Sequence, residues 1–288
     1  MTPQAGLHTL NVADALDVER EYLLFVPEGA VRALVVVFHP FGSRPELVLD
    51  GGTDGDYLQR PLTGAVSSAE QLGLALLAPR SRGRALDGVS LAWMGHLDAV
   101  WSVADGLREE FGLSSTGAGG LSMGGLEALV FAGQHPESVV AAWAANPIVD
   151  LAHWRRDLAA PGGLEGGAGL AELIGTEVGG TPEELPDEYA ARSPFDYLDA
   201  LAGVRVRIAW SPVDAVIPNQ ATAHSHPLAS RLRERGGVVV EDVVTHAPTD
   251  EKTDPGRFAH EACDTREAMG WIAEQLTNTN HSHTGGIA

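Results

Sequence analysis

The segment GGLSMGGLEAL, Gly119–Leu129, places a single serine between glycines on both sides. A serine in a tight turn between a strand and a helix can act as a nucleophile, and the residues two positions before and after it must be small because they meet across the turn. Gly120 and Gly124 meet this requirement. The backbone N–H of Met123 and the positive end of the following helix would face negative charge developing on a substrate. The pattern predicts that Ser122 is a nucleophile, with a glycine-rich turn and a capping serine as the alternative.

The elements around this serine follow an α/β pattern. Short apolar runs alternate with stretches of helical spacing, which is typical of parallel strands joined by crossover helices. The first two runs are close enough for a hairpin, and the third is apolar on both faces, as in a central strand. The run before the serine is the weakest, since Gly and Ala have low strand propensity. The eight expected strands cover residues 7–12, 20–27, 33–40, 74–80, 115–120, 139–147, 204–210 and 238–244.

Two helices and a longer insertion are expected between these strands. Residues 99–112 have apolar positions at three- and four-residue spacing and stop at a glycine, and residues 126–136 continue from the serine and end before a proline. Residues 147–203 are rich in Gly, Pro and Glu and too long for a loop plus one helix, so we expect a partly helical cap over the strand ends. We therefore expect one domain over 1–277 and a flexible tail over 278–288.

Composition excludes several classes of function. The 288 residues carry a formal net charge of −20, so phosphate backbones would be repelled and we expect no nucleic-acid partner. Cys263 is the single cysteine, which rules out an intrachain disulfide and favours a reducing compartment. The chain shows neither a signal peptide nor an apolar stretch of about 18 residues, so we expect a cytoplasmic protein without a membrane partner.

The serine motif and three further segments together resemble the serine α/β-hydrolases, in particular the esterase and prolyl-oligopeptidase-like branches. FHPFG is similar to the oxyanion turn of that family, SPVDAVIP to its acid-bearing turn, and TPEELPDEYAARSPFDYLDAL to the segment leading into it. The resemblance implies the α/β-hydrolase fold, a mostly parallel eight-stranded sheet with helices on both faces. Pro40 stands where the family usually has glycine and has no N–H to donate, so the resemblance implies Phe41, or else Gly42, as the oxyanion donor beside Met123.

The same resemblance implies the acid and the base that assist the serine, in the order serine, acid, histidine. Asp214 follows the strand expected at 204–210, at the edge of the sheet where open α/β folds bind ligands, and is the expected acid. Asp150 is the alternative acid. His260, just before the last expected helix, is the expected base, and His246, at the end of the eighth strand, remains open as the alternative.

The remaining histidines have other expected roles. His39 is expected to shape the oxyanion turn. His224 and His226, in AHSHP, could suggest a pair of metal ligands, but no cysteine or suitably spaced carboxylate accompanies them. We therefore expect neither a metal nor a cofactor.

These residues lead to the expectation of a serine hydrolase that cleaves a small or medium carboxylic ester or lactone through an acyl-enzyme on Ser122. An acyltransferase or cyclising enzyme would use the same acyl-enzyme, and a non-catalytic ligand-binding homologue would keep the fold. A peptidase of the prolyl-oligopeptidase type is less favoured, because only about thirty residues precede the third strand. The pattern does not predict the oligomeric state. Apolar candidates for the pocket wall are Phe41, Trp93, Met94, Trp143 and Trp154.

Overall fold

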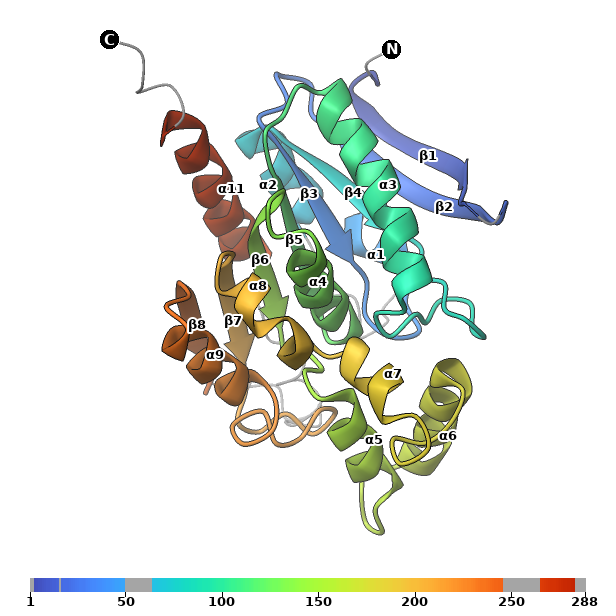
Figure 1. Cartoon of the computed structure of the whole chain (residues 1–288). Helices are drawn as coiled ribbons and strands as arrows, with labels where there is room; N and C mark the ends of the chain where they lie inside the picture. The colour runs from blue at the N-terminus through green and yellow to red at the C-terminus, as the bar shows by residue number, and fades with distance from the viewer. Residues whose placement is uncertain (1–2, 16, 50–63, 246–264, 283–288) are drawn as a thin grey trace, which may run out of the picture.

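An eight-stranded sheet forms the centre of the protein in a computed structural model that describes residues 3–15, 17–49, 64–245 and 265–282 (Figure 1). The strand order is β1-β2-β4-β3-β5-β6-β7-β8. Strand β2 runs antiparallel to both β1 and β4, and the other neighbours are parallel. All eight predicted strands and the opening hairpin are confirmed. The strands are β1 (Gly6–Ala13), β2 (Glu19–Val26), β3 (Ala33–Phe38), β4 (Leu74–Pro79), β5 (Thr116–Leu121), β6 (Val139–Ala145), β7 (Arg205–Trp210) and β8 (Val239–Val243).

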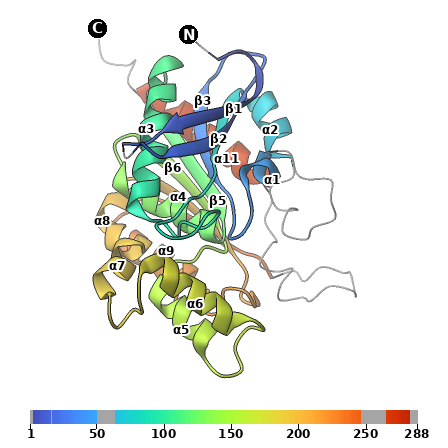
Figure 2. The same cartoon turned by 90° about the vertical axis from the view of Figure 1, so that its right-hand side faces the viewer.

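Helices cover both faces of the sheet, as Figure 2 shows along its edge. Strand β3 illustrates why: Leu34 and Val36 point into one apolar core, and Val35 and Val37 point into another. All four side chains are fully buried. The first core is covered by α3 (Met94–Glu110), α4 (Met123–Gln134) and α9 (Ser225–Glu234), and the second by α1 (Pro45–Leu49), α2 (Ala65–Leu72) and α11 (Thr265–Ser282). A strand buried on both sides reads as a continuous apolar run, which is the pattern of β3.

Strand β5 forms despite its glycines because its neighbours leave no room for larger residues. A Cβ added at Gly117 would come 2.9 Å from the side chain of Ile272 on α11. A Cβ at Gly119 would come 2.9 Å from the ring of Trp143 on β6. Packing therefore overrides the low strand propensity of this segment.

The two helices predicted around the serine are present with shifted bounds. The helix α3 (Met94–Glu110) begins five residues before the predicted start at Ala99. Trp93, before it, gives no side-chain cap hydrogen bond, so the sequence carries no start signal there. The chain leaves α3 through Gly112 at φ 67°, as the predicted stop requires. The helix α4 (Met123–Gln134) starts directly after Ser122.

The helices of the interval 147–203 fall into two groups, which lie in different parts of the molecule. Three of them, α5 (Leu151–Ala159), α6 (Gly167–Val178) and α7 (Pro186–Ala191), gather beyond the carboxyl ends of the parallel strands (Figure 1). The 3-10 helix η2 (Pro194–Tyr197) and α8 (Leu198–Leu201) instead pack beside α4, in the helix layer of the sheet. The first part of the interval thus lies at the edge where the predicted site is expected.

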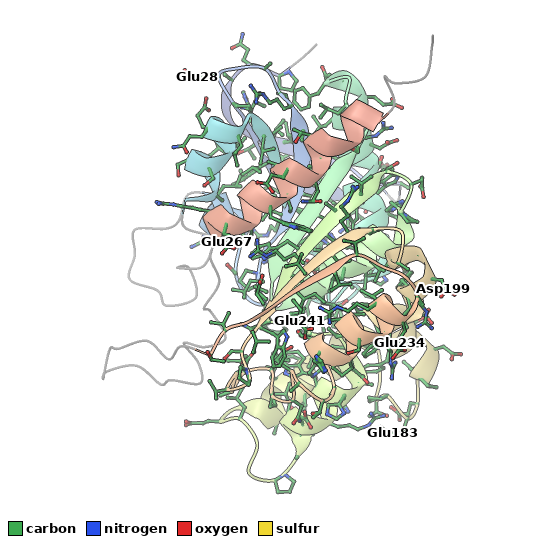
Figure 3. All side chains as sticks on the ribbon, turned by 90° about the vertical axis from the view of Figure 1, so that its left-hand side faces the viewer. Glu28, Glu183, Asp199, Glu234, Glu241 and Glu267 are labelled. Carbon is green, nitrogen blue, oxygen red and sulfur yellow. The ribbon has the colours of Figure 1, made fainter. Side chains whose placement is uncertain are left out.

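The acidic composition is visible on the surface. Figure 3 shows Glu28, Glu183, Asp199 and Glu234 at the periphery of the molecule, and each of them is exposed. The last helix continues to Ser282, so residues 278–282 of the expected tail are helical. None of the helices in the described ranges is long and apolar enough to cross a membrane.

Candidate active site

Ser122 occupies a strained turn between a strand and a helix. β5 ends at Leu121 and α4 begins at Met123, which leaves one residue for the change of direction. Ser122 has φ 59° and ψ −119°, a conformation that costs a non-glycine residue on the order of 1–3 kcal/mol. Its side chain is 5% exposed. Such strain persists only where the surrounding structure enforces it, which is a feature of nucleophile turns.

The surrounding glycines enforce this turn through backbone contacts. A Cβ added at Gly120 would lie 2.4 Å from the carbonyl carbon and oxygen of Gly124. A Cβ at Gly124 would lie 2.2 Å from the carbonyl oxygen of Phe38 at the end of β3. Both contacts are far inside the van der Waals distance and involve backbone that cannot rotate away. Glycine is therefore required at both positions, and its absence of a side chain lets α4 approach β3 closely.

The segment after β3 forms a tight turn next to this approach. The Ser43 N–H donates to the Pro40 carbonyl at 3.1 Å, and Gly42 has φ 68°, as the third residue of a type II turn requires. Phe41 is the second residue of that turn and packs against the core. Because β3 pairs with β5 up to Phe38 and Gly120, this turn and the Ser122 turn follow neighbouring strand ends.

His39 orients the peptide that carries the predicted oxyanion donor. Its Nδ1–H donates to the Pro40 carbonyl at 2.9 Å, and its Nε2 accepts the Ser81 N–H at 2.9 Å. Burial lowers the pKa of His39 to about 4, so the ring is neutral and can play both roles. The Pro40 carbonyl and the Phe41 N–H belong to one planar trans peptide and point in opposite directions. Fixing the carbonyl therefore fixes the direction of the N–H.

Asp214 lies in a second tight turn, after β7. It is 6% exposed, and its Oδ1 accepts the N–H groups of Val216 at 2.8 Å and Ile217 at 3.0 Å. The indole N–H of Trp154 on α5 donates to the Val216 carbonyl at 2.9 Å, which ties the turn to the helices beyond the sheet. Trp154 is 1% exposed and thus belongs to the core.

A chain of hydrogen bonds links the serine turn to the aspartate turn. The Ser122 N–H donates to the Ala145 carbonyl at the end of β6, at 2.9 Å. The next residue, Asn146, has φ 38°, and its Oδ1 accepts the Ser211 N–H at 2.8 Å. The Asp214 N–H donates to the Ser211 carbonyl at 3.3 Å. Asn146 was not among the predicted site residues, although an Asn before proline at a strand end is a recognisable turn signal.

The structure thus brings four predicted residues to one edge of the sheet. Ser122, Met123, Phe41 and Asp214 all follow carboxyl ends of the strands β3, β5 and β7, which are separated only by β6. The two candidate bases, His260 and His246, lie outside the described residues, and the choice between them stays a prediction.

The alternative acid has a structural role in the chain as described. The Oδ1 of Asp150 accepts the His153 N–H at 2.8 Å and so caps the amino end of α5. His224, with burial lowering its pKa to about 3, accepts the Asp150 N–H through Nδ1 at 3.1 Å. His226 instead pairs with Glu241, at 2.9 Å. The two histidines therefore serve different neighbours, and no group of three or more His, Cys, Asp or Glu side chains in the described part of the chain could hold a metal.

Solved structures share this architecture. S-formylglutathione hydrolase from Agrobacterium tumefaciens is 16% identical, with 96% of this chain and 98% of that chain covered at a TM-score of 0.59. The fluorophosphonate-binding serine hydrolase F of Staphylococcus aureus is 15% identical, with coverages of 94% and 99% and a TM-score of 0.60. Acylaminoacyl peptidase from Pyrococcus horikoshii is 15% identical, with 94% of this chain and 41% of that chain covered at a TM-score of 0.59.

The sequence by itself has no such matches. No protein-family model fits it, and no curated protein sequence is similar to it. The likeness is therefore one of overall structure, which extends over 94–96% of this chain in the three comparisons. On these observations the chain has the α/β-hydrolase fold.

Proposed function

We propose that this protein is a serine hydrolase that cleaves a small or medium carboxylic ester or lactone through an acyl-enzyme on Ser122. The observation that carries the proposal is the conformation of Ser122, at φ 59° and ψ −119°, between Gly120 and Gly124, where an added Cβ would meet backbone atoms at 2.4 and 2.2 Å. A chain gains no stability from holding a serine in this region of φ and ψ. The strain is accounted for if the hydroxyl has to stand clear of the sheet.

The chemistry follows from the groups around that hydroxyl. The Ser122 Oγ attacks the ester carbonyl carbon while His260, or His246 in its place, takes the hydroxyl proton. The N–H groups of Phe41 and Met123 stabilise the oxyanion of the tetrahedral intermediate, and Asp214 orients the imidazole. The C–O bond to the leaving alcohol then breaks and the alcohol takes the proton from the imidazole. Water attacks the acyl-enzyme by the same route and releases the acid.

The solved structures support the class of reaction but not the substrate. One of the neighbours is named an S-formylglutathione hydrolase, one a fluorophosphonate-binding serine hydrolase and one an acylaminoacyl peptidase. The net charge of −20 disfavours polyanionic acyl donors and favours a neutral ester.

Turnover of p-nitrophenyl esters of graded acyl length, and of simple lactones, tests the proposal. The Ser122→Ala variant should lose activity by about 10⁶-fold, to near background. Ser102→Ala, on the exposed face of α3, is the matched control and should keep the activity of the wild type. Full activity in Ser122→Ala would refute the assignment. Added alcohol separates the alternative, because an acyltransferase would form the new ester rather than the acid.

A further inference from the structure

A carboxyl group that the proposed reaction does not use is buried beside the site. Glu127 lies on α4, five residues after Ser122, and is fully buried within the apolar stretch LEALVFA. Burying a carboxyl group is costly unless polar groups surround it. Here Glu127 Oε2 accepts the Ser81 hydroxyl at 3.0 Å, and its Oε1 accepts the Ser90 hydroxyl. Burial raises the pKa of Glu127 to about 8, and the hydrogen bonds of Ser90, Ser81 and the Ala92 backbone partly oppose that rise.

These contacts hold both ends of one loop. Ser81 follows β4, and Ser90 precedes α3, so the loop from 81 to 92 begins and ends on the same carboxyl group. Leu91 and Ala92 have φ 48° and 56°, and each is fully buried. Left-handed conformations of this kind cost on the order of 1–3 kcal/mol per residue and persist only where contacts impose them. The loop is therefore held in one strained conformation, in part by Glu127.

The loop is also hydrogen-bonded to the oxyanion turn, through Ser81. Ser81 uses its hydroxyl on Glu127 and its backbone N–H on Nε2 of His39, at 2.9 Å. His39 in turn holds the Pro40 carbonyl and, through the planar peptide, the Phe41 N–H. Glu127, Ser81 and His39 are each 0% exposed, so bulk water has no access to replace a missing partner.

We propose that Glu127 is a positioning residue for the proposed hydrolase reaction, which fixes the direction of the Phe41 N–H through Ser81 and His39. The proposal rests on the proposed function, since that direction matters only if Ser122 reacts with a carbonyl group. Glu127 lies on α4 and Ser122 directly precedes the first residue of that helix, so the nucleophile and the oxyanion donor are both held relative to α4.

Two substitutions at Glu127 separate positioning from packing. Glu127→Leu removes all hydrogen bonding, and Glu127→Gln keeps the shape and part of the hydrogen bonding. We expect Glu127→Leu to lower kcat for a p-nitrophenyl ester by about 10- to 100-fold with KM within about twofold, since loss of a whole oxyanion donor costs about 10²–10³ in kcat. Glu127→Gln should stay within about threefold of the wild type, which is the rescue that a positioning role predicts.

Two further variants complete the design. Ser81→Ala should lower kcat in the same way, and the Ser81→Ala, Glu127→Leu double variant should be no worse than Glu127→Leu alone, because both changes break one connection. Ile272→Ala is the control for lost stability, since it opens a cavity on the opposite face of the sheet and should leave kcat unchanged. A folded Glu127→Leu variant with wild-type kcat would overturn the proposal. If Glu127→Leu does not fold, wild-type kcat in Ser81→Ala would overturn it instead.

A measurement without turnover keeps this test separate from the proposed function. In ¹⁵N-histidine NMR spectra, His39 should show a protonated Nδ1 and an unprotonated Nε2 in the wild type, and Ser81→Ala and Glu127→Leu should change that signal. If the wild type hydrolyses no ester, the proposed function fails while the spectra still decide about the connection. An unchanged His39 signal in both variants would then overturn the positioning role.

Discussion

The close approach of α4 to β3 can be tested with one added methyl group. In Gly124→Ala the new Cβ would lie 2.2 Å from the Phe38 carbonyl oxygen and 2.9 Å from that of His39. Ordinary contacts begin near 3.4 Å, so the helix and the strand must separate by about 1 Å. Overpacking against backbone should cost about 3 kcal/mol, the upper part of the usual range. That cost corresponds to a fall in Tm of roughly 6–12 °C for a chain of this size.

The same displacement should reduce the activity by more than the loss of stability alone would explain. Moving Ser122 by about 1 Å relative to the oxyanion turn should lower kcat/KM for a p-nitrophenyl ester by about 100-fold at temperatures well below Tm. Gly106→Ala is the matched control, because a Cβ at this exposed position on α3 meets nothing within 4 Å. The control should gain about 1 kcal/mol through helix propensity and keep its activity. A Gly124→Ala variant with the Tm and kcat/KM of the wild type would refute the reasoning.

Three other outcomes are expected. The Asp214→Asn variant should fold, because the amide oxygen can still accept the two backbone hydrogen bonds of the turn. Its kcat should fall by about 10⁴-fold. An unchanged kcat would show that Asp214 is not the acid of the triad. Burial lowers the pKa of His96 and His224 to about 3 and of His39 to about 4, against 6.5 in the unfolded chain. The unfolded state therefore binds more protons below pH 6.5, and each histidine should reduce the free energy of unfolding in urea titrations by about 1.4 kcal/mol per pH unit down to about pH 4. Glu127 should change the pH dependence of the free energy of unfolding in the opposite direction, because its pKa of about 8 in the folded chain exceeds the 4.5 of the unfolded chain. The free energy of unfolding should therefore fall as the pH rises from 4.5 to about 8. Glu127→Gln should abolish this contribution.

Most of the fold could be predicted because hydrophobic periodicity and turn residues carry it. The fully apolar run of β3 and the glycine-flanked serine each point to one local structure. Strand β5 could be placed only from its neighbours, since Gly117 and Gly119 have poor strand propensity and are selected by the side chains that pack over them. The start of α3 at Met94 was missed because no capping side chain precedes it.

The site could be predicted where a local motif exists and not where it depends on tertiary contacts. Ser122 and Asp214 lie in turns whose residue types are visible in the sequence. The roles of Ser81 and Asn146 depend on partners that are distant in sequence, with Ser81 reaching Glu127 and Asn146 reaching the end of β7. The signal available in the sequence was the single glutamate within the apolar stretch of α4, because a carboxyl group buried in a helix needs hydrogen-bond partners. Trp143, expected as a pocket wall, is instead a core residue packed over β5.

The central claim, that Ser122 is an activated nucleophile, is tested most directly by its reaction with a fluorophosphonate probe. Peptide mapping by mass spectrometry should find one phosphonyl adduct, on the peptide that contains Ser122, and the adduct should be absent from Ser122→Ala and from protein unfolded before exposure to the probe. The same assay should identify the histidine that activates Ser122, because the labelling rate should fall in His260→Ala and stay unchanged in His246→Ala. A folded wild-type protein that remains unlabelled, or that is labelled on a different residue, would contradict the account.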